Sequence, residues 1–254
     1  MNIAVITGAS SGMGREFAYQ LTKQESFDEV WVIARRAERL ESLAKDLPYP
    51  TRILPLDLTK QESLIEYEEL LKKEKPTVSI LINCSDFGKF GRYDQVPLQD
   101  CMDMIDLNCK ALVAVTQLTL PYLTRGSRIL QVDSLSAFQP VPYLNVYAAT
   151  KGFVMRYSQA LGAELKDRGI RIMAFCPGWV KTEFFDHAEQ TSDTAVTYFN
   201  RVFTAEEVVR CGLKDLKKGK TVCVPGWQNK LQVLAVKFFP TRFVMWVWLK
   251  QQKH

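Results

Sequence analysis

The sequence predicts an α/β fold, with one doubly wound, parallel, seven-stranded sheet and helices on both faces. Short apolar runs alternate along the chain with longer segments in which apolar residues recur every three and four positions. No linker, internal repeat or low-complexity stretch interrupts this alternation. With 254 residues and 47% hydrophobic content, the chain can bury one large core. We therefore expect a single domain over 1–226, with 227–254 as an aromatic, helical extension of it.

Seven short apolar runs are the expected strands. In chain order they are Ile3–Ile6, Val30–Ala34, Arg52–Leu56, Ser79–Asn83, Arg128–Val132, Arg171–Phe175 and Thr221–Val224. Ligands of an open parallel sheet bind beyond the carboxyl ends of its strands. The residues expected at those ends, for the first six strands, are Gly8, Arg35, Asp57, Asn83, Ser134 and Pro177.

A glycine-rich turn links the first strand to the first helical pattern. Its glycines are Gly8, Gly12 and Gly14, and the turn also contains Ser10, Ser11 and Met13. Glycine lets the backbone approach a pyrophosphate closely, and the amides and dipole of the following helix favour negative charge. Taken alone, such a turn is about as often a plain connection between strand and helix as a nucleotide site.

A second motif contains a phenol and an ammonium group. Tyr147 and Lys151 are four residues apart, so on a helix they project from one face, and Ser134 lies thirteen residues before Tyr147. A cation beside a phenol stabilises the phenolate and lowers its pKa, which suits a proton donor near neutral pH. In isolation the pair would indicate no more than two exposed helix residues.

Together, these motifs resemble the short-chain dehydrogenase/reductase family over nearly the whole chain, including its hydroxysteroid dehydrogenases. The matching blocks, in the family's order, are Thr7 to Gly14, Asp57 with Leu58, Asn83, Asn108, Ser134, Tyr147, Lys151 and Pro177 to Thr182. The resemblance implies a Rossmann-like, NADP-binding catalytic domain over 1–226. It also implies transfer of hydride between a nicotinamide and a carbonyl.

The resemblance assigns a role to each catalytic position. Tyr147 would donate a proton to the carbonyl oxygen, and Lys151 would lower the pKa of that tyrosine and hold the nicotinamide ribose. Ser134 would hold the substrate oxygen, and Asn108 would anchor a water that relays protons to Lys151. Ser136 points to the same side if its segment is extended, so only the family's spacing selects Ser134.

The remaining matched residues would bind the cofactor. Asp57 and Leu58 correspond to its adenine side, and Asn83 begins the segment after the fourth strand. The residues of the nicotinamide loop are Pro177, Gly178, Val180 and Thr182.

One position departs from the family pattern. After the fourth strand the family usually has Asn-Asn-Ala-Gly, whereas this chain has Asn83, Cys84, Ser85 and Asp86. Asp86 brings a side chain and a negative charge to a turn that normally lies against the cofactor ribose. Because aspartate tolerates left-handed conformations, we expect the path of the backbone to survive and the local electrostatics to change.

The residues after the second strand predict NADP(H) as the cofactor. An NAD-binding sheet usually has an acidic residue there, about 20 residues beyond the glycines. This chain has Arg35 and Arg36 instead. Guanidinium groups can bind a 2′-phosphate through charge-assisted hydrogen bonds, and two cations at a helix start suggest an anion between them. The alternative is that one or both are solvated surface charges.

The substrate is expected to be bulky and hydrophobic, of steroid or acyl-chain type, because apolar residues dominate the candidate pocket. They are Leu135, Phe138, Val141, Pro142, Tyr143, Leu144, Trp179, Phe184, Phe185, Tyr198 and Phe199. About half of these would be plain core packing. The alternative functions are a 3-oxoacyl carrier-protein reductase and a non-catalytic NADPH-binding sensor.

Composition argues against other classes of function. The net charge of +5 is modest and spread along the chain, so we expect no nucleic-acid partner. The six cysteines show no metal-ligand spacing and there are two histidines, so we expect reduced thiols and no metal.

The first strand begins within two residues of Met1, which predicts a cytoplasmic protein. The family resemblance predicts a homodimer or homotetramer.

The extension after Val224 is aromatic but interrupted by charges and proline, so it is too broken to span a bilayer. Three interpretations remain open, in this order of preference: helices over the substrate cleft, a subunit interface, and a membrane-surface anchor. In the first interpretation, an aromatic face that includes Phe239, Phe243 and Trp246 would close over the cleft.

Overall fold

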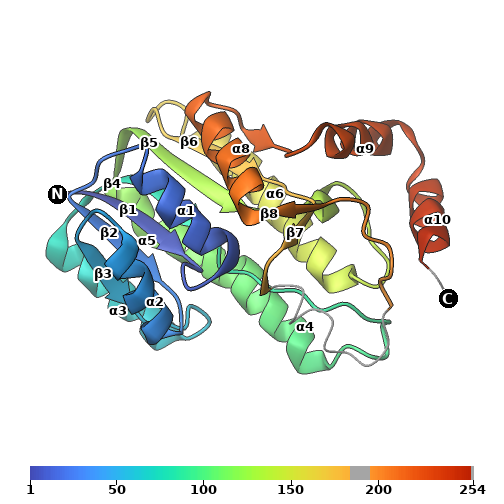
Figure 1. Ribbon diagram of the computed structural model, residues 1–254, viewed down its shortest axis with the longest axis horizontal. Coiled ribbons are helices and arrows are strands. Elements are labelled where there is room, and N and C mark those ends of the chain that lie inside the picture. Colours follow the sequence, from blue (N-terminus) through green and yellow to red (C-terminus); the bar gives the residue numbers. More distant parts are fainter. Residues whose placement is uncertain (184–194, 253–254) are drawn as a thin grey trace.

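The computed structural model describes residues 1–183 and 195–252, and its main sheet has seven parallel strands in the order β3-β2-β1-β4-β5-β6-β9 (Figure 1). The strands are β1 Asn2–Thr7, β2 Glu29–Ile33, β3 Thr51–Leu54, β4 Thr77–Asn83, β5 Leu123–Val132, β6 Arg171–Phe175 and β9 Val222–Cys223. The chain runs outward from β1 to β3 and then returns to place β4 on the other side of β1. This order confirms the predicted doubly wound sheet and places its topological switch point between β1 and β4.

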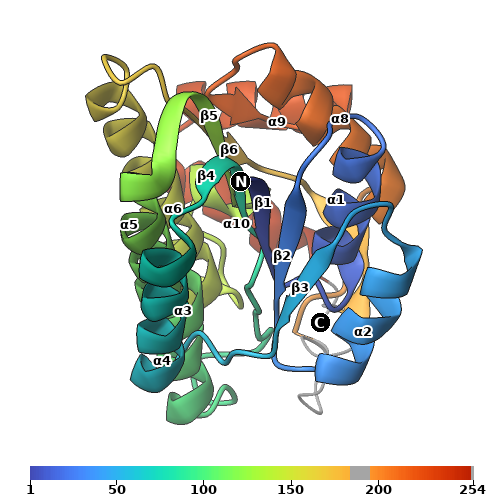
Figure 2. The ribbon, with the colours of Figure 1, turned by 90° about the vertical axis from the view of Figure 1, so that its left-hand side faces the viewer.

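Helices cover both faces of the sheet because side chains alternate along its buried strands. On β1, Ala4 and Ile6 face one layer of the core, whereas Ile3 and Val5 face the other. The first layer is covered by α1 Gly12–Thr22, α2 Ala37–Asp46 and α8 Ala205–Lys217. The second is covered by α3 Gln61–Glu74, α5 Leu112–Thr119 and α6 Asn145–Glu164 (Figure 2). Strands buried on both faces read as continuous apolar runs, which is why the sequence pattern located them.

One helical segment contains a wide turn. Helix α4, Leu98–Ile105, passes into a π-helical turn at Asp106–Ala111 and then into α5. Such turns close hydrogen bonds five residues apart and occur often at functional sites. This turn contains Asn108, one of the expected catalytic residues.

Two strand features were not expected from the sequence. Strand β5 begins five residues before the predicted run, and its pairing with β4 shifts register between Val78 and Ile80. Beside this irregularity the Ser127 hydroxyl donates to the Val78 carbonyl at 2.7 Å and accepts from the Thr124 amide at 3.0 Å. A second, two-stranded parallel sheet pairs β7, Trp179–Lys181, with β8, Val202–Thr204. These three-residue strands are too short to stand out as periodic patterns.

The chain ends in two helices on one side of the sheet, α9 Trp227–Phe238 and α10 Thr241–Gln251 (Figure 1). They are separated at Pro240, which lacks the amide needed to continue α9. Within the described residues, no helix has both the length and the apolar character needed to cross a bilayer.

Candidate active site

A cavity of about 1070 Å³ lies at the carboxyl ends of the strands and contains most of the predicted site residues. The predicted cofactor residues in its wall are Gly8, Ser10, Ser11, Gly12, Met13, Gly14, Arg35, Arg36, Asp57, Leu58, Pro177, Gly178, Val180 and Thr182. Of the predicted catalytic residues, Ser134 and Tyr147 line it. Lys151 and Asn108 are buried behind this wall, each with 1% of its surface exposed.

The glycine turn is shaped for close backbone approach. Gly8 has a φ of 68°, and a Cβ atom there would lie 2.5 Å from the Cys84 carbonyl oxygen. A Cβ atom on Gly14 would lie 2.2 Å from the Gly8 carbonyl oxygen. Ser11 is the N-cap residue of α1 and makes no side-chain cap hydrogen bond, so the first amides of the helix remain available for an anion. The turn therefore fits the pyrophosphate of a dinucleotide.

Two arginines meet a carboxylate at the edge of this turn. The Arg36 guanidinium donates to Ser11 Oγ at 2.9 Å, to Ser10 Oγ at 3.2 Å and to the Glu183 carboxylate at 3.0 Å. Arg39, which the sequence analysis did not select, donates to the other oxygen of Glu183. These arginines hold the pKa of Glu183 below its usual value. The anion expected between Arg35 and Arg36 is therefore found between Arg36 and Arg39 instead, and it is the Glu183 carboxylate of the chain itself.

Two other predicted cofactor residues, Asp57 and Asn83, differ in their position relative to the cavity. Asp57 lies in the cavity wall and accepts hydrogen bonds from the Thr59 amide and hydroxyl at 3.1 and 2.7 Å. Asn83 does not reach the cavity: its side chain is 4% exposed and donates to Thr116 Oγ1 and Gln131 Oε1, both at 2.9 Å. Asn83 therefore holds β4, β5 and α5 together and offers no side-chain group to a cofactor.

Ser134 and Tyr147 are brought together at the cavity wall. Ser134 follows β5 and is the N-cap residue of a short 3₁₀ helix, Leu135–Phe138, where its Oγ accepts from the Ser136 amide at 3.2 Å. Tyr147, in the first turn of α6, shares a side-chain hydrogen bond with Ser134. Because the segment turns at this point, Ser136 does not duplicate Ser134, and its hydroxyl is buried without a partner among the described residues.

Lys151 lies behind Tyr147 and is held by two acceptors. Its Nζ atom is 5.4 Å from the centre of the Tyr147 ring, donates to the Val132 carbonyl at 3.0 Å and forms an ion pair with Asp86. The departure from the family pattern at Asp86 is therefore a direct contact to the expected catalytic lysine. Burial is the largest single effect and lowers the pKa of Lys151, but the charges of Asp86, Tyr147 and Asp133 together outweigh it, so the pKa is raised overall.

Burial has the largest effect on the pKa of Tyr147. Burial raises the pKa of Tyr147 strongly, the Lys151 charge lowers it, and Asp86 raises it again, so the net direction is upward. The expected lowering by Lys151 is present but does not dominate. A further positive charge in the cavity, or the loss of the Asp86 charge, would move the pKa of the phenol down.

Another acidic residue, Asp133, is buried near Lys151 and directly before Ser134. It is 2% exposed, accepts from the Ser134 amide at 2.9 Å and lies 3.8 Å from Cys176 Sγ. Burial raises the pKa of Asp133 to about 8, although the Lys151 charge lowers it. One lysine thus faces two carboxyl groups, those of Asp86 and Asp133. Sequence reasoning missed it because a residue directly after a strand gives no sign of its burial.

Asn108 occupies the π-helical turn and holds the loop after β4. Its Nδ2 donates to the Phe87 carbonyl at 2.9 Å and to Thr150 Oγ1 at 3.1 Å, and its Oδ1 accepts from the Phe87 amide at 3.1 Å. Both ends of the carboxamide are engaged, so the side chain positions the segment that carries Asp86. The backbone of the wide turn is the part of Asn108 that could hold a water.

The nicotinamide loop is fixed at both ends. The Pro177 carbonyl accepts from the Leu135 amide at 3.0 Å, which ties the loop to the Ser134 segment. Strand β7 then carries Val180 into the parallel pairing with β8. These contacts place the loop opposite the glycine turn, where a Cβ atom on Gly12 would be 3.2 Å from the Thr182 side chain.

The other half of the cavity is largely apolar and is partly formed by the C-terminal helices. Of the predicted pocket residues, Leu135, Val141, Leu144, Trp179 and Tyr198 line it. Phe138, Pro142, Tyr143 and Phe199 are not among the lining residues, although Tyr143 and Phe199 pack against the apolar cluster that contains Val141, Leu144 and Trp248. Phe184 and Phe185 lie outside the described residues. Helices α9 and α10 add Gln232, Ala235, Val236, Phe239, Phe243, Val244, Val247, Trp248 and Gln251.

The C-terminal helices are anchored by Trp248. Its ring is 9% exposed, and its Nε1 donates to the Pro142 carbonyl at 2.9 Å. Gln252 then accepts from the Thr197 amide at 3.0 Å. Phe243 and Phe239 are in the wall, as expected, whereas Trp246 is not among the lining residues.

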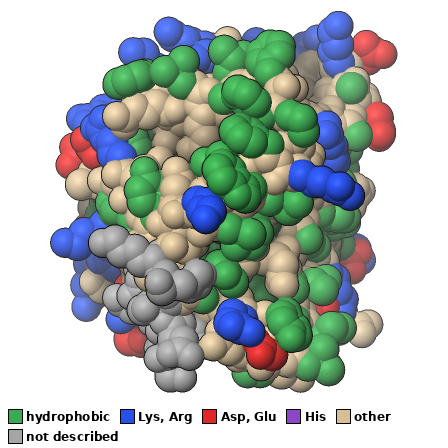
Figure 3. Space-filling model, turned by 90° about the vertical axis from the view of Figure 1, so that its right-hand side faces the viewer, with side chains coloured by type: hydrophobic (Ala, Val, Ile, Leu, Met, Phe, Trp, Pro, Cys, Tyr) green, Lys and Arg blue, Asp and Glu red, His purple; other side chains and the backbone are tan. Residues whose placement is uncertain are grey.

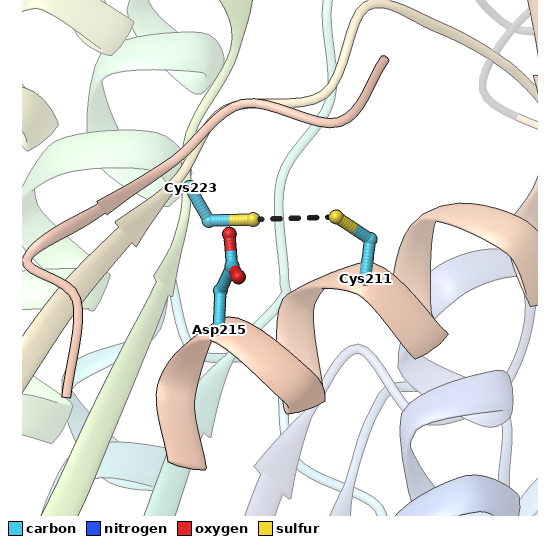
Figure 4. Close-up of side chains that lie close together, drawn as sticks. All are labelled: Cys211, Asp215 and Cys223. Atoms are coloured by element: carbon cyan, nitrogen blue, oxygen red, sulfur yellow. Dashed lines mark hydrogen bonds between the residues drawn. The ribbon is translucent and has the colours of Figure 1, made fainter. Parts of the chain in front are cut away.

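Away from the cavity, the structure brings together Cys211 and Asp215 from α8 and Cys223 from β9 (Figure 4). The two sulfur atoms are 3.9 Å apart, and Lys220 forms an ion pair with Asp215. A hydrogen bond from Cys223 holds the pKa of the Cys211 thiol below its usual value. All six cysteines are free, as expected, but nothing in the sequence indicated this contact between Cys211 and Cys223, because the helix and the strand that carry them meet only in the fold.

Comparison with known proteins identifies the family. The model of the short chain dehydrogenase family matches residues 2–193. A 17-beta-hydroxysteroid dehydrogenase type 3 from Danio rerio is 33% identical over 231 residues, which cover 85% of this chain and 70% of that protein.

Solved structures with the same fold include one in complex with NADPH and one in complex with NAD. A short-chain dehydrogenase from Sphingobium yanoikuyae in complex with NADPH is 25% identical, with a TM-score of 0.80 over 100% of this chain and 98% of that one. A short chain dehydrogenase/reductase from Burkholderia phymatum in complex with NAD is 17% identical, with a TM-score of 0.78 over 93% and 92%, and shows the fold alone. The likeness therefore does not choose between NADP and NAD. The chain belongs to the short-chain dehydrogenase family, whose members are oxidoreductases that bind a nicotinamide cofactor.

Proposed function

We propose that the protein is an NADP(H)-dependent oxidoreductase that interconverts a ketone and a secondary alcohol on a bulky hydrophobic substrate. One observation carries this proposal: the hydroxyls of Ser134 and Tyr147 lie where the dinucleotide half of the cavity meets its apolar half. A carbonyl oxygen at this junction can contact both hydroxyls while its apolar substituents extend toward α9 and α10.

The two hydroxyls have different tasks. Ser134 Oγ already accepts from the Ser136 amide, so its own proton is free to point toward the substrate oxygen or Tyr147. Tyr147 then donates its proton to the carbonyl oxygen in the reduction direction and accepts one in the oxidation direction. Such proton transfer contributes roughly two to four decades in rate. The bound nicotinamide supplies the hydride chemistry.

Lys151 supports the phenolate that remains after proton transfer. Its charge lies 5.4 Å from the phenol ring in a buried site, where electrostatic interactions are strong. The Val132 carbonyl fixes its position, and the charges of Asp86, Tyr147 and Asp133 together raise its pKa. We also assign to Asp86 a contact with the nicotinamide ribose, since it lies in the cavity wall beside the ammonium group.

The preference for NADP(H) rests on Arg36. This side chain is positioned by Ser10 and Ser11 at the edge of the glycine turn and pairs with a carboxylate at 3.0 Å. A 2′-phosphate carries more charge than that carboxylate, so it would replace Glu183 with a net gain. Each charge-assisted hydrogen bond contributes roughly 1.5–3 kcal/mol, or about one to two decades of affinity.

The experiment is single-turnover oxidation of NADPH against a panel of steroids, other bulky ketones and acyl thioesters. We expect turnover with bulky ketones, loss of turnover in Tyr147→Phe with cofactor binding retained, and a smaller loss in Ser134→Ala. If Tyr147→Phe keeps more than a few per cent of the rate, Tyr147 is not the acid. A preference for acyl thioesters would favour the carrier-protein reductase, and no turnover with any carbonyl would favour the sensor.

A further inference from the structure

The outer surface of α9 is apolar, contrary to the usual pattern of a surface helix. Trp227, Leu231, Leu234 and Phe238 are all more than half exposed, with Phe238 at 78%. At roughly 100° per residue, these four positions fall within about 60° of one another. The buried Asn229 lies on the opposite side and anchors the helix to the domain through the Pro225 carbonyl.

The connection to α10 continues this surface. Phe239, Phe243 and Trp246 form a ladder, with ring centres 5.2 and 5.8 Å apart, and each is at least 45% exposed. Seen from this side of the molecule, hydrophobic side chains gather in a band down the middle of the face, with basic side chains among and beside them (Figure 3). We call the exposed apolar residues of 227–249 the outer face.

The charged residues within α9 and α10 all have one sign. Between residues 227 and 252, the charged residues are Lys230, Lys237, Arg242 and Lys250, and all four are exposed. This stretch contains no aspartate or glutamate. Aromatic and aliphatic side chains flanked only by lysine and arginine are the composition of helices that lie in the interface of an anionic membrane.

We infer that the outer face of α9 and α10 docks on the surface of an anionic lipid bilayer. The helices lie flat, insert their aromatic side chains at the boundary between headgroups and acyl chains, and place their basic side chains among lipid phosphates. Neither helix spans the bilayer, in agreement with their length and composition.

A second copy of the chain is a poorer occupant on electrostatic grounds. A twofold dimer joins the same patch of both subunits, so the four basic residues of one outer face would meet those of the other. Like charges brought together in this way disfavour association. An anionic lipid surface instead complements every charge on the face.

Docking would also set the direction from which ligands enter. Phe239 and Phe243 belong both to the outer face and to the cavity wall, so the rim of the cavity lies at the docked surface. Apolar molecules dissolved in the bilayer could then enter the cavity without crossing water. The docking itself does not depend on the proposed function.

The test is co-sedimentation of the full chain with two kinds of vesicle. One kind contains phosphatidylcholine alone, and the other contains about 30% phosphatidylglycerol as well, which makes its surface strongly anionic. We expect binding to the anionic vesicles that weakens in high salt. Trp227→Gln/Phe238→Gln should lower the partition coefficient at least about tenfold, and Lys230→Gln/Lys237→Gln roughly tenfold or more.

The matched control is Ile65→Gln/Leu98→Gln, which removes two exposed apolar side chains from α3 and α4 and should leave vesicle binding unchanged. Thermal melts and NADPH titration establish that each variant is folded. The proposal is overturned if the wild-type protein stays in the supernatant, or if the control and the Trp227→Gln/Phe238→Gln variant lose binding equally. It is also overturned if light scattering shows that Trp227→Gln/Phe238→Gln halves the molecular mass, because a second copy then covers the face.

Discussion

The ion pair between Asp86 and Lys151 predicts an unusual pH dependence. The carboxylate offsets the charge that would otherwise stabilise the Tyr147 phenolate. Asp86→Asn removes the charge but keeps an oxygen that can accept from Lys151, so the lysine does not lose its partner. We expect this variant to have a lower pKa at Tyr147 than the wild-type protein.

The size of the shift follows from the geometry. A unit charge 5.4 Å from the Tyr147 ring, at an effective dielectric constant of about 20, contributes roughly 3 kcal/mol, or about two pKa units. If Asp86 offsets about half of this attraction, its removal lowers the pKa of Tyr147 by about one unit. Oxidation of the alcohol requires the deprotonated tyrosine, so the rate rises with pH through this pKa.

The assay is the pH profile of kcat/KM for oxidation of any accepted alcohol. The midpoint of the rising limb should lie about one unit lower in Asp86→Asn than in the wild-type protein. Glu183→Gln is the control, since it removes a carboxylate from the same cavity wall without touching Lys151, and its midpoint should not move. A midpoint in Asp86→Asn that is unchanged or higher would refute the electrostatic role of Asp86.

Three further predictions concern other groups. Arg36→Ala should weaken NADPH binding at least about tenfold and NADH binding little, and Glu183→Gln should tighten NADPH binding. Isothermal titration of each variant with both cofactors tests this, and equal changes in the affinities for NADPH and NADH would contradict it. The pKa of Asp133 is raised to about 8, so the burial of this carboxyl group lowers the stability of the folded protein increasingly as the pH rises from about 4 to 8. Asp133→Asn should therefore raise Tm more at pH 8.5 than at pH 5. A stability gain of about 2 kcal/mol corresponds to a rise in Tm of roughly 4–8 °C. The lowered pKa of Cys211 predicts that iodoacetamide labels it first at pH 7.5, and mass spectrometry showing faster labelling of the buried Cys223 would exclude this.

The parts of the fold that could be read from the sequence are those fixed by local patterns. The runs Val30–Ala34 and Arg171–Phe175 located strands β2 and β6, Glu29–Ile33 and Arg171–Phe175, because strands covered on both sides of the sheet leave an apolar run in the sequence. Ser134, Tyr147 and the glycine turn lie in one cavity because each occurs at a fixed point after a strand or on a helix. Asn83 follows its strand in the same way, yet the structure turns its side chain into the core.

The features that could not be predicted depend on contacts between distant segments. Asp86 and Lys151 are 65 residues apart, and Arg36 and Glu183 are 147 residues apart. No propensity or periodicity encodes which charged side chains meet across a cavity. The sequence did show that Asp86 was unusual, and the identity of its partner came only from the packing of α6 behind the loop.

The π-helical turn at Asp106–Ala111 has a consequence for comparing and engineering related sequences. It amounts to one residue inserted into an otherwise continuous helix from Leu98 to Thr119. Deleting a single residue here would restore a regular helix but rotate its first half by about 100° relative to the second. Asn108 would then lose its two hydrogen bonds to the Phe87 backbone, which hold the loop that carries Asp86. A one-residue alignment gap within this turn should therefore mark a relative whose active site has been rebuilt, even where every catalytic side chain is retained.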